Sequence, residues 1–518
     1  MIFSSIQYLF FLPLVVFLYW RLKGQARLVL TVVASYVFYM SWLPVYGLLL
    51  ALMTTINWLL SLGIARAVGS VAENRQEAKP QEKSAPIKPL TARLLLGAGL
   101  LLNVGALCYY KYANFVFENL ARLVHSAGNL LPADTVFSHI KFNLEAFHTP
   151  LVEAALPLGI SFFVFEFVHY LCDVYRGDKA VKSLFEFAAF AAFFPSQIAG
   201  PIKRYQDFMP KLRNPLPLTN NLAVEGMSLF MQGLFKKAAI ADPLGAIIAQ
   251  PFATLNTLSA GDAWLAGIGF VVQVYCDFSG YTDMGRGSAL LLGIRLPENF
   301  KLPLMTRDVT TFWKHWHMSL GSWLRDYVYI PLGGSRCSKF KQGRNLVLTM
   351  TACGIWHGGT WHYVLWGVAE GLGLIVHREW CGLLEKYPKA LAFFDGKIGA
   401  VLNRLMLFAF IIPTYSLFRS PDMPHALNLW AGYFNFGSAF TMTEVVVKSG
   451  ILVIGGSYLF FWLATEYLRK HETLLDGVIK TAEGSFQNPV RLATWTAAAI
   501  LMVAAKPLEA VPFVYFQF

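Results

Sequence analysis

The chain has 518 residues, of which 56% are hydrophobic and only 14% are charged, and its mean hydropathy is +0.48. Soluble domains carry about 25% charged residues, so this composition excludes a soluble protein with one large core and predicts a polytopic membrane protein. The net charge of +12 does not indicate nucleic-acid binding, because membrane proteins retain cationic loops on the cytoplasmic side and the chain carries no nucleic-acid-binding motif.

Twelve apolar segments, separated by polar or turn-forming residues, follow one another along the chain. They lie at 6–20, 28–44, 46–65, 93–110, 155–172, 184–200, 225–250, 262–294, 346–377, 400–418, 450–468 and 490–505. Because a helix of roughly 20 residues crosses the hydrocarbon core, we predict an all-α polytopic protein with about eleven transmembrane helices. Segment 184–200 is the exception: Pro195 and Gly200 interrupt it and both flanks are basic, which indicates a re-entrant helix.

The charge of the connecting segments predicts the topology. Residues 66–92 are rich in Lys, Arg, Glu and Pro and are expected to form a flexible cytoplasmic linker. Residues 111–154 are thin in Lys and Arg and are expected outside the cytoplasm. Residues 301–345 contain eight Lys and Arg side chains, which place this part of the chain at the cytoplasmic face.

Charged side chains within apolar sequence are the first candidates for function, because ionisable groups are costly in a membrane. In FFPSQIAGPIKRYQDF, Lys203 and Arg204 follow the broken segment and could contact the phosphates of a nucleotide-bearing donor or the headgroups of lipids. In VYCDFSGYTDMGRGSALLLGIRLPENF, Asp283 and Arg286 are three residues apart and predict a structural acid–base pair. Asp277 also lies in the apolar part of that stretch, before this pair.

The stretch TRDVTTFWKHWHMSLGSWLRDYVYIPLGG, residues 306–334, contains apolar side chains at helical spacing. The stripe consists of Trp313, Trp316, Leu320, Trp323, Leu324 and Tyr327. His317 lies four residues after Trp313 and shares this face, whereas His315 lies on the polar face. Taken alone, the motif favours a core histidine bonded to a backbone carbonyl over a catalytic histidine.

Two further histidines lie in TACGIWHGGTWHYVLWG, within a run that has no Asp, Glu, Lys or Arg between Arg344 and Glu370. His357 and His362 are five residues apart, about 140° around a helix, so they do not form the i, i+4 pair of a zinc site. The glycine pair after His357 loosens the helix and leaves space for a ligand, and a buried imidazole can act as a general base. His362, among aromatic residues, is expected at the membrane interface.

Together these motifs resemble the membrane-bound O-acyltransferase (MBOAT) family, and above all its bacterial members that modify alginate, peptidoglycan and teichoic acid. The resemblance rests on FWKHWHMSLGSWLRDYVYIPLGG, GIWHGGTWHYVLWG, CDFSGYTDMGRG, LPENF and FPSQIAGPI, and extends from KYANF at 111–115 to the last residue. It implies a single domain over 1–518 in a bacterial inner membrane. Within it, a ring of about eleven helices, with re-entrant and interfacial helices, surrounds a central tunnel.

The resemblance also implies roles for individual residues of the core motifs at 301–377. His357 corresponds to the catalytic histidine of the family and His317 to its second near-invariant position. No metal or permanently bound cofactor is expected, and acetyl-CoA is the expected acyl donor. The candidates for substrate binding are Trp313, Trp316, Trp356, Asn299, Asp277, Lys203, Arg204 and Arg325.

The last six residues, 513–518, fit the pattern FxYxxF, in which Tyr515 supplies the only hydroxyl group. This pattern resembles a C-terminal acyl-relay motif, known as a separate small protein in the D-alanylation system and as a tail in bacterial MBOAT members. The resemblance implies that Tyr515 accepts the acyl group and passes it on. An aromatic anchor at the membrane interface is the alternative.

The expected reaction begins with acetyl-CoA at the basic cytoplasmic face. His357 removes the proton of the attacking hydroxyl group, while His317 positions the donor or stabilises the carbonyl oxygen. A periplasmic partner that resembles SGNH-type esterases is expected to complete the transfer to a polysaccharide, because the chain has no large extracytoplasmic domain of its own. The alternatives are transfer of a D-alanyl or longer acyl group, and a transporter that relays protons through buried histidines.

Overall fold

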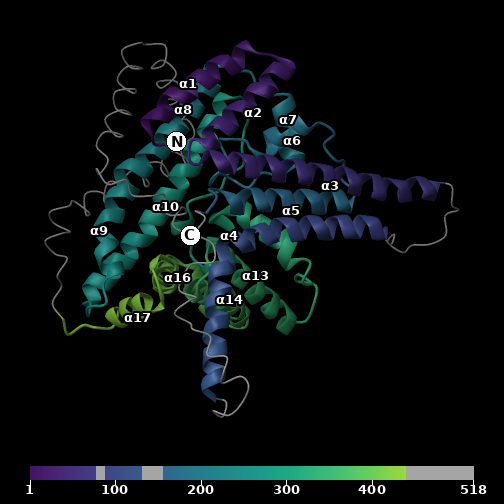
Figure 1. Cartoon of the computed structure of the whole chain (residues 1–518). Coiled ribbons are helices and arrows are strands. Elements are labelled where there is room, and N and C mark those ends of the chain that lie inside the picture. The colour runs from purple at the N-terminus through teal and green to yellow at the C-terminus, as the bar shows by residue number, and fades with distance from the viewer. Residues whose placement is uncertain (77–87, 131–155, 439–518) are drawn as a thin grey trace, which may run out of the picture.

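The computed structural model describes residues 1–76, 88–130 and 156–438, and every regular element in these ranges is a helix (Figure 1). The all-α class is therefore confirmed for the described part of the chain, whereas the tail at 513–518 lies outside it. In chain order the elements are α1 (Ile6–Arg21), α2 (Gly24–Met40), α3 (Pro44–Gln76), α4 (Leu90–Leu130), α5 (Ile160–Arg176), α6 (Leu184–Ala191), α7 (Tyr205–Arg213), α8 (Asn220–Phe235), the π-turn η2 (Lys236–Ala241), α9 (Asp242–Ala253), α10 (Ala260–Leu291), the 3₁₀ turn η3 (Pro303–Met305), α11 (Val309–His315), α12 (Met318–Leu324), the π-turn η4 (Arg325–Tyr329), α13 (Lys339–His357), α14 (Trp361–Leu384), α15 (Pro388–Asp395), α16 (Lys397–Arg419) and α17 (Met423–Gly432).

Three helices of the described part are long and apolar enough to cross a membrane. They are Pro44–Gly69 within α3, Leu90–Leu123 within α4, and α16. The other long helices carry charges among their apolar residues, as α10 does at Asp277 and Asp283. The ring of about eleven transmembrane helices therefore stays a prediction beyond these three spans.

The polar connections are shorter than predicted, because the helices on either side continue into them. α3 extends to Gln76 and α4 to Leu130, so the predicted loops at 66–92 and 111–154 are partly helical. Ala, Arg, Glu and Gln, which follow the apolar part of α3, are good helix formers, and the end of an apolar run need not be the end of the helix. The rest of each loop lies outside the described residues.

Segment 184–200 is helical only in its first part. α6 has 8 residues and is about 12 Å long, too short to cross a bilayer. The chain from Ala192 to Gly200 is irregular and buried, and the helix ends before Pro195 as expected. Side chains from other elements satisfy this buried backbone, as when the N–H of Phe194 donates to the hydroxyl of Ser35.

The long helices are arranged around two groups. α3, α4 and α5 pack against one another, and α4 then continues past the pair formed by α13 and α14 (Figure 1). α10 packs against α8, α9 and α16. The buried helix α5 faces the segment that carries the first histidine motif, because the indole of Trp323 donates to the carbonyl oxygen of Phe165.

Glycines allow α8 and α10 to approach closely. A Cβ atom at Gly233 would lie 2.4 Å from the carbonyl oxygen of Gly280, and one at Gly287 would lie 2.5 Å from that of Gly226. The two glycines of each helix are seven residues apart, so they face their partners on the antiparallel helix. Small residues are the usual means of close helix packing in membranes, and this spacing was a sequence signal that our prediction did not use.

The apolar segment 346–377, predicted as one element, is an antiparallel hairpin of two helices. α13 ends at His357 and α14 begins at Trp361, because the glycine pair between them breaks the helix. Glycines again bring the backbones together: a Cβ atom at Gly354 would lie 2.2 Å from the carbonyl oxygen of Tyr363. His357 therefore lies at the tip of a hairpin rather than in the middle of a span.

Gly367→Ala is expected to destabilise this hairpin by about 1–3 kcal/mol, because an added methyl group in a packed interface forces the backbones apart. The new Cβ atom would lie 2.4 Å from the carbonyl oxygen of Met350. The melting temperature of the purified full chain measures the effect. Gly382→Ala is the matched control on the same helix, since a Cβ atom there meets nothing within 4 Å and should leave stability unchanged or higher. Equal melting temperatures for both variants would contradict the close packing.

Candidate active site

His317 lies at a break between two short helices, not within one continuous helix as predicted. α11 ends at His315, α12 begins at Met318, and His317 has a φ of 43°. A positive φ is costly for a residue with a Cβ atom, and residues with such backbone strain cluster at active sites. The argument from helical spacing was therefore wrong about the local backbone, although the side chain is buried as expected, with 1% of its surface exposed.

Asn299 holds the left-handed turn and the imidazole of His317 in place. Its backbone oxygen accepts from the N–H of Met318, and its Oδ1 accepts from the N–H and the hydroxyl of Ser319 at 3.2 and 2.9 Å. Nδ1 of His317 lies 3.1 Å from the same Oδ1. Since that oxygen only accepts, Nδ1 carries the hydrogen, and Nε2 of the neutral ring carries the lone pair. The candidate residue Asn299 thus determines the tautomer of His317.

His357 is enclosed by aromatic rings, with 4% of its surface exposed. Its ring centroid lies 4.6 Å from that of Trp356, 4.9 Å from Phe418 and 5.3 Å from Trp366. Trp356 also contacts His317, with centroids 6.3 Å apart. The structure therefore brings the two predicted histidines together around one indole, although forty residues separate them in the sequence.

α4 contacts the hairpin tip that carries His357. The ammonium group of Lys111 donates to the carbonyl oxygen of Trp356 at 2.6 Å, and the hydroxyl of Tyr112 donates to that of Ile355 at 2.7 Å. The sequence analysis did not select Lys111. The available signal was a lysine inside an otherwise apolar span, which is costly unless the charge has a partner.

His362 is buried, with 3% of its surface exposed, and not at an interface as predicted. Its imidazole lies 2.9 Å from the hydroxyl of Thr360, the residue that precedes α14. Because the helix breaks between His357 and His362, their predicted 140° separation on one helix does not apply. Within the described ranges, no set of three or more His, Cys, Asp or Glu side chains is placed to hold a metal ion.

A buried carboxylate links the two histidine motifs. Glu370 of α14 accepts from the indole of Trp313 at 3.0 Å and from the hydroxyl of Thr414 at 2.8 Å, and its surface is fully buried. These contacts join α11, α14 and α16 around the site. The substrate-binding candidate Trp313 thus has a structural partner that spacing in the sequence did not reveal.

Trp316, another substrate-binding candidate, is buried. It stacks on Phe312, with ring centroids 5.4 Å apart and an angle of 18° between the planes, and its ring meets Phe300 edge-on at 5.1 Å. Because Phe300 follows Asn299 directly, Trp316 packs beside the turn that carries His317. The contacts of Trp316 are thus with aromatic side chains of the protein.

The basic candidates Lys203 and Arg204 are both paired. Lys203, with 2% of its side chain exposed, lies 2.7 Å from the carboxylate of Glu166, so the lipid-headgroup interpretation does not apply to it. Arg204 lies 2.7 Å from Asp326, which also pairs with the exposed candidate Arg325. Burial alone would raise the pKa of Asp326, but hydrogen bonds from Arg325 and Arg204 lower it below its ordinary value.

Two acidic residues of α10, Asp277 and Asp283, form ion pairs with two consecutive lysines. The predicted pair of Asp283 and Arg286 is confirmed at 3.5 Å, and Lys236 lies 2.7 Å from Asp283. The candidate Asp277 lies 2.8 Å from Lys237. The π-helix η2 supplies both lysines, and α10 packs against it. This ion pair accounts for the position of Asp277 without a substrate.

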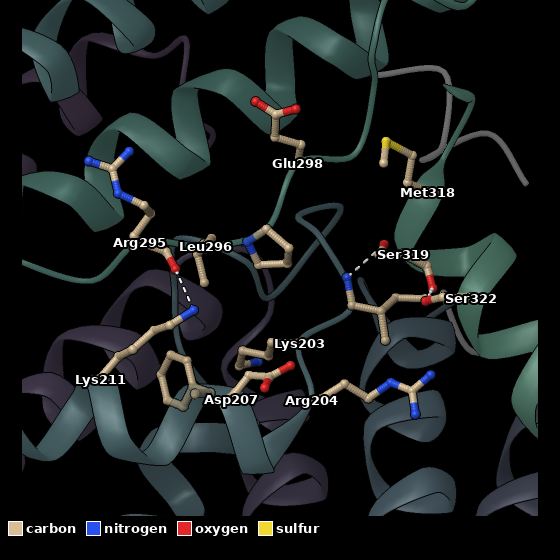
Figure 2. Close-up of a pocket in the computed structure, with 13 residues that line it drawn as sticks. Lys203, Arg204, Asp207, Lys211, Arg295, Leu296, Glu298, Met318, Ser319 and Ser322 are labelled. Carbon is tan, nitrogen blue, oxygen red and sulfur yellow. Dashed lines mark hydrogen bonds between the residues drawn. The ribbon is translucent and has the colours of Figure 1, made fainter. Parts of the chain in front are cut away.

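A pocket of about 260 Å³ lies beside the His317 turn (Figure 2). Figure 2 shows Lys211 and Arg295 on one side of the pocket and Met318 and Ser319 on the other. The lining is Ile202, Lys203, Arg204, Asp207, Phe208, Lys211, Arg295, Leu296, Pro297, Glu298, Met318, Ser319 and Ser322. Four cationic and two acidic side chains thus line a space that reaches the residues directly after His317, and neither catalytic candidate lines it. Three of the four cations, Lys203, Arg204 and Arg295, form ion pairs with carboxylates, and this lining is called the cationic pocket below.

Known proteins are similar to this chain over most of its length. Residues 87–418 match the model of the MBOAT, membrane-bound O-acyltransferase family. The chain is 34% identical to the probable alginate O-acetylase AlgI of Pseudomonas putida over the whole of both chains. It is 36% identical to that of Azotobacter vinelandii, over 86% of this chain and 80% of the relative. The peptidoglycan O-acetyltransferase of Helicobacter pylori is 32% identical, over 66% of this chain and 64% of the relative.

Proposed function

Because this chain belongs to the membrane-bound O-acyltransferase family, and is an O-acyltransferase, we propose that it moves an acetyl group from cytoplasmic acetyl-CoA to a polysaccharide outside the inner membrane. The observation that carries the proposal is the pair of buried histidines, His317 and His357, which both contact Trp356. The identity to alginate O-acetylases supports acetyl as the acyl group and an alginate-like polymer as the acceptor.

The cationic pocket is the proposed entrance for the donor. Lys211 lies on one wall of it and presents positive charge to the phosphates of coenzyme A, whereas the guanidinium of the neighbouring Arg295 is paired with Glu225. Ser319 lies on the opposite wall and contacts Asn299, which holds His317. A donor whose phosphates bind here extends its thioester arm past Ser319 toward the two histidines, through a passage that belongs to the predicted central tunnel.

His357 acts as the general base. Its imidazole accepts the proton of the acceptor hydroxyl, and the oxygen attacks the carbonyl carbon of the thioester. When the tetrahedral intermediate collapses, the carbon–sulfur bond breaks and the proton passes from the imidazolium to the sulfur of coenzyme A. The aromatic rings of Trp356, Trp366 and Phe418 exclude water, which would otherwise hydrolyse the thioester.

We assign to His317 the role of positioning the acyl donor, and not that of stabilising the carbonyl oxygen. With its Nδ1 hydrogen directed at Asn299, the neutral ring offers Nε2 as an acceptor. An acceptor suits the amide N–H groups of the pantetheine arm, whereas an oxyanion needs a hydrogen-bond donor. Of the two roles expected for His317, donor positioning is thus the one that the hydrogen bond supports.

Tyr515 is the proposed first acceptor of the acetyl group. The group would then pass to a periplasmic partner that resembles SGNH-type esterases and acetylates the polymer. Tyr515 lies outside the described residues, and the proposal for it rests on the FxYxxF pattern.

The test is the rate of CoA release in the first turnover after acetyl-CoA is added to the purified full chain in lipid nanodiscs, where Tyr515 is the acceptor. We expect wild type to release CoA and to acquire one labelled acetyl group at Tyr515, and Tyr515→Phe to stay unlabelled while remaining folded. Wild type that releases no CoA would favour a transporter or an inactive scaffold, since neither consumes a thioester. A Tyr515→Phe variant that supports full polymer acetylation in cells would leave Tyr515 with an anchoring role only.

A further inference from the structure

Lys111 is a charged residue in the middle of an apolar helix. It lies within Leu90–Leu123, one of the three helices long and apolar enough to cross a membrane. An ammonium group at such a position is costly, so its retention requires a specific partner or function. Lys111 is half-buried and is not one of the residues that line the cationic pocket.

The partner of Lys111 is the end of the helix that carries His357. The last carbonyl groups of a helix have no intrahelical donor, and their partial negative charge attracts cations. At the end of α13, Lys111 donates to the carbonyl oxygen of Trp356 and Tyr112 to that of Ile355. The ammonium group also lies 5.8 Å from the centre of the Trp356 ring. Two successive residues of α4 thus complete the helix end next to the imidazole.

The contact between α4 and the hairpin tip continues beyond this point. A Cβ atom at Gly359 would lie 2.9 Å from the carbonyl oxygen of Lys111, so only glycine allows the tip to lie against α4. One turn further, Trp361 packs edge-on against Phe115 and its indole donates to Asn119 at 2.9 Å. α4 therefore contacts residues that precede His357 in the sequence and residues that follow it.

We propose that Lys111 is a positioning residue for His357: its ammonium group closes the end of α13 and holds the imidazole in the orientation that proton transfer requires. The inference rests on the proposed role of His357 as a general base. It assigns to Lys111 an effect on the transfer step and none on donor binding, because the cationic pocket is lined by other residues.

Lys111→Met tests the proposal, because methionine has a similar length and lacks both the charge and the hydrogen-bond donors. In the CoA-release assay with the full chain in nanodiscs, we expect the maximal rate to fall about tenfold, with the half-saturating acetyl-CoA concentration unchanged within about twofold. Tyr112→Phe is the matched control, since it removes an uncharged hydrogen bond to the neighbouring carbonyl, and should change the maximal rate by less than about threefold. Lys111→Arg should recover most of the lost rate.

Three results would overturn the proposal. They are a wild-type maximal rate in Lys111→Met, an equal loss of maximal rate in Lys111→Met and Tyr112→Phe, and a change in Lys111→Met that affects only the half-saturating acetyl-CoA concentration. If Lys111→Met fails to fold, Lys111→Gln replaces it and must also show a lower maximal rate. Failure of the proposed function is a separate outcome, because then wild type releases no CoA or His357→Ala remains active. The positioning role is judged only where wild type is active and His357→Ala is not.

Discussion

Polysaccharide acetylation is expected to fall at least about 100-fold in His357→Ala, because removing a general base typically costs 10²–10⁴-fold in rate. The maximal rate of CoA release should fall by the same factor, while the half-saturating acetyl-CoA concentration changes little. Acetyl content of the polymer from cells that express the variant measures the first effect, and the nanodisc assay measures the second. The protein should still insert and elute as a folded species, since only one ring is lost from the packing around Trp356 and Phe418.

His362→Ala is the matched control for His357→Ala. It also removes a buried imidazole from the same hairpin, but that imidazole contacts Thr360 and Tyr363, whereas the rings of Trp356, Trp366 and Phe418 surround His357. We expect it to retain activity even where it costs some stability. Normal acetylation in a folded His357→Ala protein would remove His357 from the mechanism, whereas equal losses in both variants would indicate a structural cause.

His317→Ala is expected to lower kcat/KM about 100-fold, with most of the change in KM for acetyl-CoA. Removal of the imidazole leaves a buried N–H group of acetyl-CoA without a hydrogen-bond acceptor, which costs about 3 kcal/mol. This pattern differs from that of His357→Ala, in which the loss lies in kcat. Initial rates over a range of acetyl-CoA concentrations separate the two.

Asn299 variants test the proposed tautomer of His317. Asn299→Ala removes the oxygen that accepts from Nδ1 and from Ser319, and should reproduce part of the KM increase. Asn299→Asp keeps that oxygen and should recover donor binding. His315→Ala, two residues before His317 and only partly buried, is the control and should bind the donor normally. A His317→Ala protein that loses kcat at constant KM would contradict the positioning role.

Sequence patterns were sufficient for those features that depend on local chemistry. Composition indicated helices in a membrane, and the spacing of Asp283 and Arg286 predicted their contact. The glycine pair after His357 was expected to loosen a helix, but the prediction did not extend to the helix end that the structure shows there. The same reasoning failed at His317, because helical periodicity assumes a continuous helix. The left-handed turn depends on Asn299, 18 residues away, and no repeating pattern records such a contact.

The remaining parts of the site depend on contacts between distant segments. Lys111 and Trp356 are 245 positions apart, and Lys203 and Glu166 are 37 apart. Lys111 and Lys203 were both visible in the sequence as charged residues next to apolar segments, where burial of a charge is unfavourable. The partners of these two lysines could not be predicted, because they depend on how α4, α5 and the hairpin of α13 and α14 pack in the folded protein.

The left-handed backbone of His317 has a consequence for engineering. Glycine adopts a φ of 43° without the strain that a residue with a Cβ atom incurs there, but glycine at this position would leave empty the buried space that the imidazole fills. Directed evolution scored on thermal stability alone selects on backbone strain and packing at this position and not on donor binding. Screens for a sturdier catalyst must therefore measure product formation in the same round.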